Sequence, residues 1–111
     1  MAKYMVLYNS TASASELMAK ASPEEMKASM DEWMKWKDEA TKSVKFEWGL
    51  PLQITTRLTP TGPTTSDSPV SGYAIMEGEK EAVLDALATH PNLKREGASI
   101  DVLEMISMPG M

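Results

Sequence analysis

The chain contains no cysteine, and histidine occurs only once, at His90. A disulfide framework, a thiolate nucleophile and a cysteine-ligated metal are therefore excluded. A single histidine among scattered carboxylates has no metal-ligand spacing, so we expect neither a metal nor a cofactor. The absence of cysteine also fits a reducing compartment, and the cytoplasm is the expected location.

The sequence also lacks a basic cluster and a long apolar run. Its 11 Lys and Arg are outnumbered by 16 Asp and Glu, which gives a formal net charge of -5. This balance argues against nucleic acid or an anionic membrane as a partner, because phosphate-binding surfaces carry a basic stripe. No segment approaches the ~20 apolar residues of a membrane span. Neither a phosphate-binding glycine loop nor a nucleophile elbow is present, so no motif dictates a reaction.

The strongest local pattern predicts a helix over Ser22–Val44. Ser22 followed by Pro23 and Glu25 matches a capping box with proline at the first helical position. Apolar residues then repeat at steps of three and four, which is typical of an amphipathic helix lying on a flat surface. The members of this stripe are Met26, Met30, Trp33, Ala40 and Val44.

The other elements follow from shorter patterns, in a chain of 111 residues that fits one domain over residues 1–111. A loop is expected over Asn9–Ala21, and a long mobile loop, either a lid or a tolerated insertion, over Thr59–Pro69, which contains three prolines. Gly72 marks a bulge or a close backbone approach. Strands are expected at Lys3–Tyr8, Leu52–Leu58, Val70–Met76 and Ser99–Ile106, and a second helix at Glu79–Thr89.

The order of these elements is strand, helix, strand, strand, helix, strand. It predicts an α+β domain of the ferredoxin-like βαββαβ type, in which two helices cover one face of a four-stranded antiparallel sheet. Strand 1 is apolar on both faces, since Met5 and Leu7 alternate with Tyr4, Val6 and Tyr8. An apolar second face needs a cover, and a homodimer with its two sheets packed face to face is the expected solution.

Several segments together resemble the YCII-related family of dimeric α/β-barrel proteins, and the resemblance covers nearly the whole chain. They are KYMVLY, SPEEMKASMDEWMKW, GLPL, VSGYAIMEGE and ATHPNLKREGASIDVLEMISM. The resemblance implies a ferredoxin-like subunit that dimerises through its sheet and leaves a pocket between sheet and helix. Some members carry a catalytic His and Asp pair with the His on the first helix, but Pro23–Val44 contains no histidine. Ser66–Pro69 matches the Asp-Gly-Pro-Phe motif of a related subgroup only loosely.

Six residues are candidates for a site. His90 is a candidate general base, or else it caps the carbonyls at the end of the second helix. Trp33 and Trp36 either pack in the core or wall a ligand pocket. Lys37 lies near the centre of the apolar stripe, where it either extends its amine to water or presents a buried amine to a pocket. Arg57 and Tyr73 fall on faces of neighbouring strands and form a polar cluster if those faces meet.

These residues favour a protein that binds a small polar or aromatic ligand in a pocket between sheet and helix. Two alternatives stay open at this point. One is a cofactor-independent enzyme that acts on a small keto or phenolic compound. The other is a non-catalytic dimeric interaction module, which the absence of a complete catalytic constellation supports.

Overall fold

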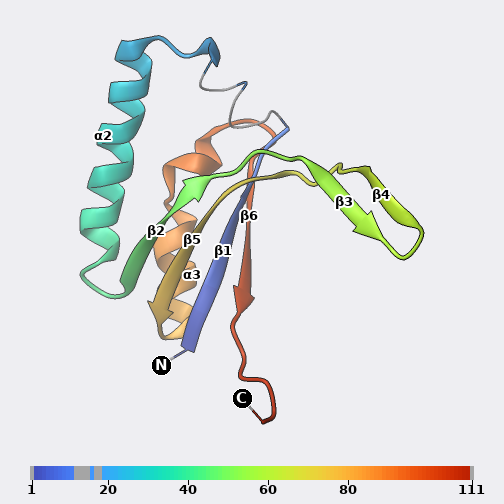
Figure 1. Cartoon of the computed structure of the whole chain (residues 1–111). Coiled ribbons are helices and arrows are strands. Elements are labelled where there is room, and N and C mark those ends of the chain that lie inside the picture. The colour runs from blue at the N-terminus through green and yellow to red at the C-terminus, as the bar shows by residue number, and fades with distance from the viewer. Residues whose placement is uncertain (1, 12–15, 17–18, 111) are drawn as a thin grey trace.

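The computed structural model describes residues 2–11, 16 and 19–110. Within them the chain is an α+β structure with a four-stranded antiparallel sheet, a separate two-stranded sheet and two α-helices (Figure 1). The predicted loop over Asn9–Ala21 is wrong in part, because Asn9 belongs to β1 and Glu16, Ala19 and Lys20 are helical; residues 12–15, 17 and 18 lie outside the described residues. In chain order the elements are β1 (Ala2–Asn9), α2 (Pro23–Ala40), β2 (Lys45–Pro51), β3 (Thr56–Thr59), β4 (Gly62–Thr65), β5 (Val70–Gly78), α3 (Lys80–Ala88), the short 3-10 helix η1 (Pro91–Lys94) and β6 (Ser99–Glu104).

The main sheet has the strand order β2-β5-β1-β6, and every neighbouring pair is antiparallel. The register places Val6 opposite both Ala74 and Val102. The register shifts on both sides of Gly72, once between β5 and β1 and once between β5 and β2. The predicted irregularity at Gly72 is therefore confirmed as a bulged region.

Both helices pack against the same face of this sheet. Trp36 and Ala40 of α2 and Val83 and Leu87 of α3 belong to one buried core cluster. From the sheet this core receives Tyr4, Val6, Tyr8, Ala74 and Met76. Trp36 also joins the two helices directly, because its Nε1 donates to the carbonyl oxygen of Ala86 at 2.8 Å.

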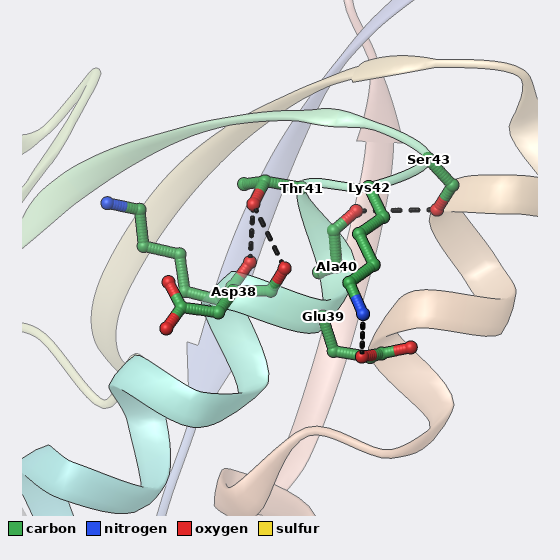
Figure 2. A network of polar contacts seen from close by, with 7 residues as sticks. Asp38, Glu39, Ala40, Thr41, Lys42 and Ser43 are labelled. Carbon is green, nitrogen blue, oxygen red and sulfur yellow. Dashed lines mark hydrogen bonds and ion pairs between the residues drawn. The ribbon is translucent and has the colours of Figure 1, made fainter.

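Helix α2 begins and ends close to where its sequence predicts. The Ser22 hydroxyl oxygen accepts the backbone N–H of Glu25 at 3.1 Å, which confirms the N-terminal cap. The sequence predicts an end between Ala40 and Phe46, and the helix ends at Ala40, where side-chain hydroxyls bond its last carbonyls (Figure 2). Thr41 Oγ1 donates to the carbonyl oxygens of Lys37 and Asp38, and this local bonding competes with further helical turns.

Only the second half of α2 is buried by the sheet. Met26 and Met30, which the apolar stripe places inward, are 46% and 59% exposed, so this part of the prediction is wrong. The reason is length, since 18 residues at ~1.5 Å each carry the N-terminal half beyond the elements that α2 contacts. Of the stripe, only Ala40 and Val44 are buried, and Trp33 is half-buried.

The predicted strand over Leu52–Leu58 is correct only for its last three residues, and it is not the second strand of the main sheet. The second strand of the sheet is β2, Lys45–Pro51, and residues 52–55 form no strand. The last residues of the predicted strand, Thr56–Leu58, belong to β3, and β4 lies within the predicted loop from Thr59 to Pro69; these two strands pair only with each other. This hairpin, which we call the arm (Thr56–Thr65), projects away from the sheet (Figure 1).

The second face of the main sheet is not covered by either helix. Met5, Leu7, Tyr73 and Ile75 are half-buried on this open face, and Leu103 is 48% exposed. Lys3, Glu77 and Lys45 lie side by side across one end of it. The prediction that strand 1 carries large apolar side chains on both faces is confirmed.

In the described part of the chain, no helix combines the length and apolar character needed to cross a membrane.

Gly49 lies where β2 closely approaches the neighbouring strand β5. A Cβ at this position would lie 2.1 Å from the carbonyl oxygen of Tyr73, a backbone atom that cannot yield without moving the strand. We expect Gly49→Ala to lower the free energy of unfolding by ~1–3 kcal/mol in urea denaturation. Gly72→Ala is the matched control, because its Cβ meets nothing closer than 3.6 Å. Equal stability of the two variants would contradict this close approach.

Candidate functional site

The structure brings together some of the six predicted site residues and separates the others. Trp33, Trp36 and His90 meet between α2, the sheet and η1. Arg57 lies on the arm, where it pairs with Asp67, and this guanidinium holds the pKa of the Asp67 carboxyl below its ordinary value. Tyr73 lies on the open face of the sheet. The predicted polar cluster of Arg57 and Tyr73 is therefore absent from the described structure.

An aromatic cluster surrounds His90. Its ring centroid lies 4.2 Å from that of Trp36, 4.4 Å from that of Trp33 and 4.9 Å from that of Tyr8. Trp33 also stacks on Trp48, with 5.7 Å between centroids and 21° between the planes. Trp36 is buried in the core, whereas Trp33 is half-buried and Trp48 is 39% exposed. The cluster thus runs from a closed interior at His90 to an open edge at Trp48.

His90 is a neutral hydrogen-bond donor rather than a base. Its Nδ1 accepts the backbone N–H of Asn92 at 2.9 Å, so in the neutral ring the proton resides on Nε2. Burial, with 1% of the residue exposed, lowers the pKa of His90 to about 4. The expected capping of the carbonyls that end the second helix is wrong. The side chain instead caps the start of η1 by accepting an N–H.

Three buried polar atoms at or beside this cluster have no hydrogen-bond partner. They are Tyr8 Oη, His90 Nε2 and Asn92 Nδ2. Each can donate a hydrogen bond, and burial raises the pKa of Tyr8, so its phenol keeps its proton. A buried donor left unpaired costs ~1–3 kcal/mol. Folded proteins rarely accept this cost three times in one place without a water or a ligand that receives the bonds.

The open edge of the cluster combines apolar and cationic groups. Lys37 Nζ lies 6.0 Å from the ring centroid of Trp48, at the limit of a cation–π contact. Lys37 is half-buried, and Met30 and Met34 on the same helix are 59% and 41% exposed. Trp48 and Lys37 thus form a partly exposed edge of the cluster that carries one positive charge.

The arrangement is suited to hold an oxygen atom beside an aromatic wall. Neutral N–H and O–H donors stabilise a carbonyl or carboxylate oxygen, and they strengthen in a site from which water is excluded. His90 cannot also act as a base at neutral pH, because the lone pair on its Nδ1 already accepts the N–H of Asn92. The chemistry that this cluster supports is therefore oxygen binding or carbonyl polarisation.

Three contributors were not singled out from the sequence, namely Tyr8, Trp48 and Asn92. Tyr8 could have been found from strand alternation, because it shares the inward face with Tyr4 and Val6. Trp48 alternates with Phe46 on the same face of β2, a pattern hidden by the misplaced second strand. Asn92 gives no signal in the sequence, since only the turn after His90 brings it into the interior.

Within the described residues, no group of three or more His, Asp or Glu side chains is arranged to hold a metal ion. No family model matches the sequence, and no curated protein matches it either.

Proposed function

We propose that the protein binds a small aromatic molecule that carries an oxygen acceptor, such as a ketone or a carboxylate, between α2 and the helix-facing side of the sheet. The observation that carries this proposal is the unpaired state of Tyr8 Oη and His90 Nε2, on rings 4.9 Å apart. The acceptor oxygen takes their hydrogen bonds. The half-buried Trp33 and the exposed edge of Trp48 stack on the aromatic body.

A neutral ketone is the favoured form of this acceptor. The two donors carry no charge at neutral pH, because the pKa of His90 lies at about 4 and that of Tyr8 is raised. Burying a carboxylate against neutral donors costs more than burying a carbonyl. Lys37 beside Trp48 is the one cation that the described structure records against the aromatic cluster, and it favours an anionic substituent only at the exposed edge of Trp48.

Tyr8→Phe tests the proposal, because it removes one hydroxyl and keeps the ring. We expect the free variant to be as stable as the wild type or up to ~1–3 kcal/mol more stable, since an unpaired buried donor is lost. We expect its affinity for acetophenone to fall about tenfold, measured by NMR shifts of the Trp33 and Trp48 indole N–H signals. Ethylbenzene, which lacks the oxygen, should bind both proteins equally weakly.

Tyr4→Phe is the matched control. Tyr4 lies on the same strand and faces the same core, but its hydroxyl donates to Glu104 Oε1 at 3.4 Å. This variant should leave acetophenone binding unchanged. If Tyr8→Phe destabilises the free protein and alters no ligand affinity, the hydroxyl serves a structural water and the proposal fails.

An enzyme acting on a keto compound is the second candidate. Its specific support is the pairing of an N–H donor and an O–H donor, which is suited to polarise a carbonyl. It needs a group that moves a proton, and the Nδ1 lone pair of His90 already accepts the Asn92 N–H. Turnover of an aromatic ketone, lost in His90→Gln and in Tyr8→Phe but kept in Tyr4→Phe, would distinguish catalysis from binding.

We infer further that the subunit has the ferredoxin-like arrangement of the YCII-related family and forms a homodimer through the open face. The ferredoxin-like arrangement is supported by the strand order β2-β5-β1-β6 and by the position of one helix after β1 and another after β5 in the chain. For the second part, the open face has an apolar centre that includes Met5, Leu7 and Ile75, bordered by Lys3 and Glu77. An apolar centre with a charged rim is the usual anatomy of a protein interface.

The dimer is tested by light scattering after size exclusion at micromolar concentration. We expect a mass twice that of the 12.2 kDa chain. Ile75→Lys places a charge at the centre of the open face and should give a monomer. Leu58→Lys, at an 80% exposed position on the arm, is the control and should stay dimeric. A monomeric wild type contradicts the inference.

A further inference from the structure

A cavity lies at the end of the main sheet opposite its charged row, where β1 ends and β5 and β6 begin. Its volume is about 470 Å³, within the ~300–1,000 Å³ typical of small-molecule sites. Residues that line it include Asn9, Leu52, Ile54, Pro69, Ser71 and Ser99. The aromatic cluster around His90 contributes none of the lining residues, so this cavity is a separate feature.

Irregular strand pairing places the cavity at this end of the sheet. The register between β1 and β5 shifts between Tyr8 and Asn9, and the register between β2 and β5 shifts between Trp48 and Pro51. Bulges bend a strand and redirect its side chains, and they are enriched beside binding sites. After the second shift the chain leaves the sheet, and Leu52 and Ile54 form one apolar wall.

Asn9 provides the distinctive polar group. Its Nδ2 donates to Asp101 Oδ2 at 2.9 Å and to Ser99 Oγ at 3.2 Å. A carboxylate only accepts hydrogen bonds, so this contact fixes which amide atom is the nitrogen. The remaining atom, Oδ1, is buried and has no partner. It is a pure acceptor on a residue that is only 6% exposed.

We propose that this cavity binds a small molecule with an apolar body and a head group that donates a hydrogen bond, a hydroxyl or an ammonium. The body lies against the wall of Leu52, Ile54 and Pro69. The head inserts between the side chains that cover Asn9 Oδ1 and donates to it. This bond replaces no bond to water, because the oxygen is sealed from solvent in the free protein. A carboxylate head has no hydrogen to donate to Oδ1 and is therefore disfavoured.

Three ligands of one shape test the donor requirement, namely 2-phenylethanol, 2-phenylethylamine and 3-phenylpropionate. Binding is followed in ¹H–¹⁵N spectra of the whole chain, through the Asn9 side-chain amide and the backbone amides of Ser10 and Ser71. We expect the alcohol, the amine or both to shift these signals saturably, and the carboxylate to leave them unchanged. Ile54→Arg, at a 38% exposed position in the wall, should weaken binding about tenfold or more. Leu58→Arg on the arm should not.

Each of the following outcomes contradicts the proposal that this cavity binds such a molecule. Shifts that are largest with the carboxylate, or an absence of shifts with all three ligands, overturn the proposal. Shifts confined to the Trp33 and Trp48 indole signals place the ligand in the aromatic cluster, which leaves the proposed function standing and rejects this second site. An Ile54→Arg variant that binds as the wild type does, with an unchanged spectrum elsewhere, also overturns it.

Discussion

The free energy of unfolding is expected to fall by about 3 kcal/mol between pH 7 and pH 4 because of His90 alone. Above the ordinary histidine pKa of 6.5, the ring is neutral in both the folded and the unfolded chain. Below pH 6.5 the histidine of the unfolded chain becomes protonated, whereas the buried ring of the folded chain stays neutral until about pH 4. Stability is therefore lost as the pH falls through this window, by ~1.4 kcal/mol per pH unit.

Urea denaturation at half-unit pH intervals measures this slope. His90→Gln carries no titrating ring and should remove the slope between pH 6.5 and pH 5, where exposed carboxylates remain ionised in both states. Where that variant folds poorly, the His90 ring protons give an independent readout by NMR, and they should not titrate above pH 5. A His90 ring that titrates near pH 6.5 in the folded protein contradicts its burial.

Trp36→Ala is expected to destabilise the fold by ~3–5 kcal/mol, the range for removing a large buried aromatic ring. Trp36 is 7% exposed and belongs to the core formed by both helices and the sheet. Its hydrogen bond to Ala86 joins α2 to α3. Because folded domains have only ~5–15 kcal/mol in total, the variant will lie close to the threshold of folding. Far-ultraviolet circular dichroism during urea denaturation follows it without relying on tryptophan.

Two further variants serve as comparisons for Trp36→Ala. Trp36→Phe keeps an apolar ring and loses the indole bond, so it should cost clearly less and still fold. Trp48→Ala removes a tryptophan that is 39% exposed and should also cost less than Trp36→Ala. Equal losses from Trp36→Ala and Trp48→Ala would show that the exposed edge of the aromatic cluster is buried in solution.

The elements that the sequence predicts well are those whose signal is local. The Ser22 cap, the inward alternation of Tyr4, Val6 and Tyr8, and the irregularity at Gly72 all arise from neighbouring residues, and each is present. The misplaced second strand has a tertiary cause. Leu52–Leu58 alternates as a strand should, but β2 pairs with β5 through Phe46 and Trp48 and ends at a bulge before that alternation begins.

The candidate site is predicted in part for the same reason. Trp33, Trp36 and His90 converge because an amphipathic helix and a helix end both face the sheet. The unpaired donors are invisible in the sequence, since they depend on how the η1 turn orients His90 and Asn92. Arg57 and Tyr73 lie apart because Arg57 is on the arm, which projects from the sheet, whereas Tyr73 is in β5.

The arm also makes part of the chain free to change in length. Its strands pair only with each other, and Gly62 at its turn has a positive φ with nothing within 4 Å of an added Cβ. Residues inserted at this turn displace no core side chain, and the entropy of closing a longer loop grows only by ~0.6 kcal/mol for each doubling. The tip of the arm is therefore the natural place to graft a peptide or a tag without disturbing the folded sheet.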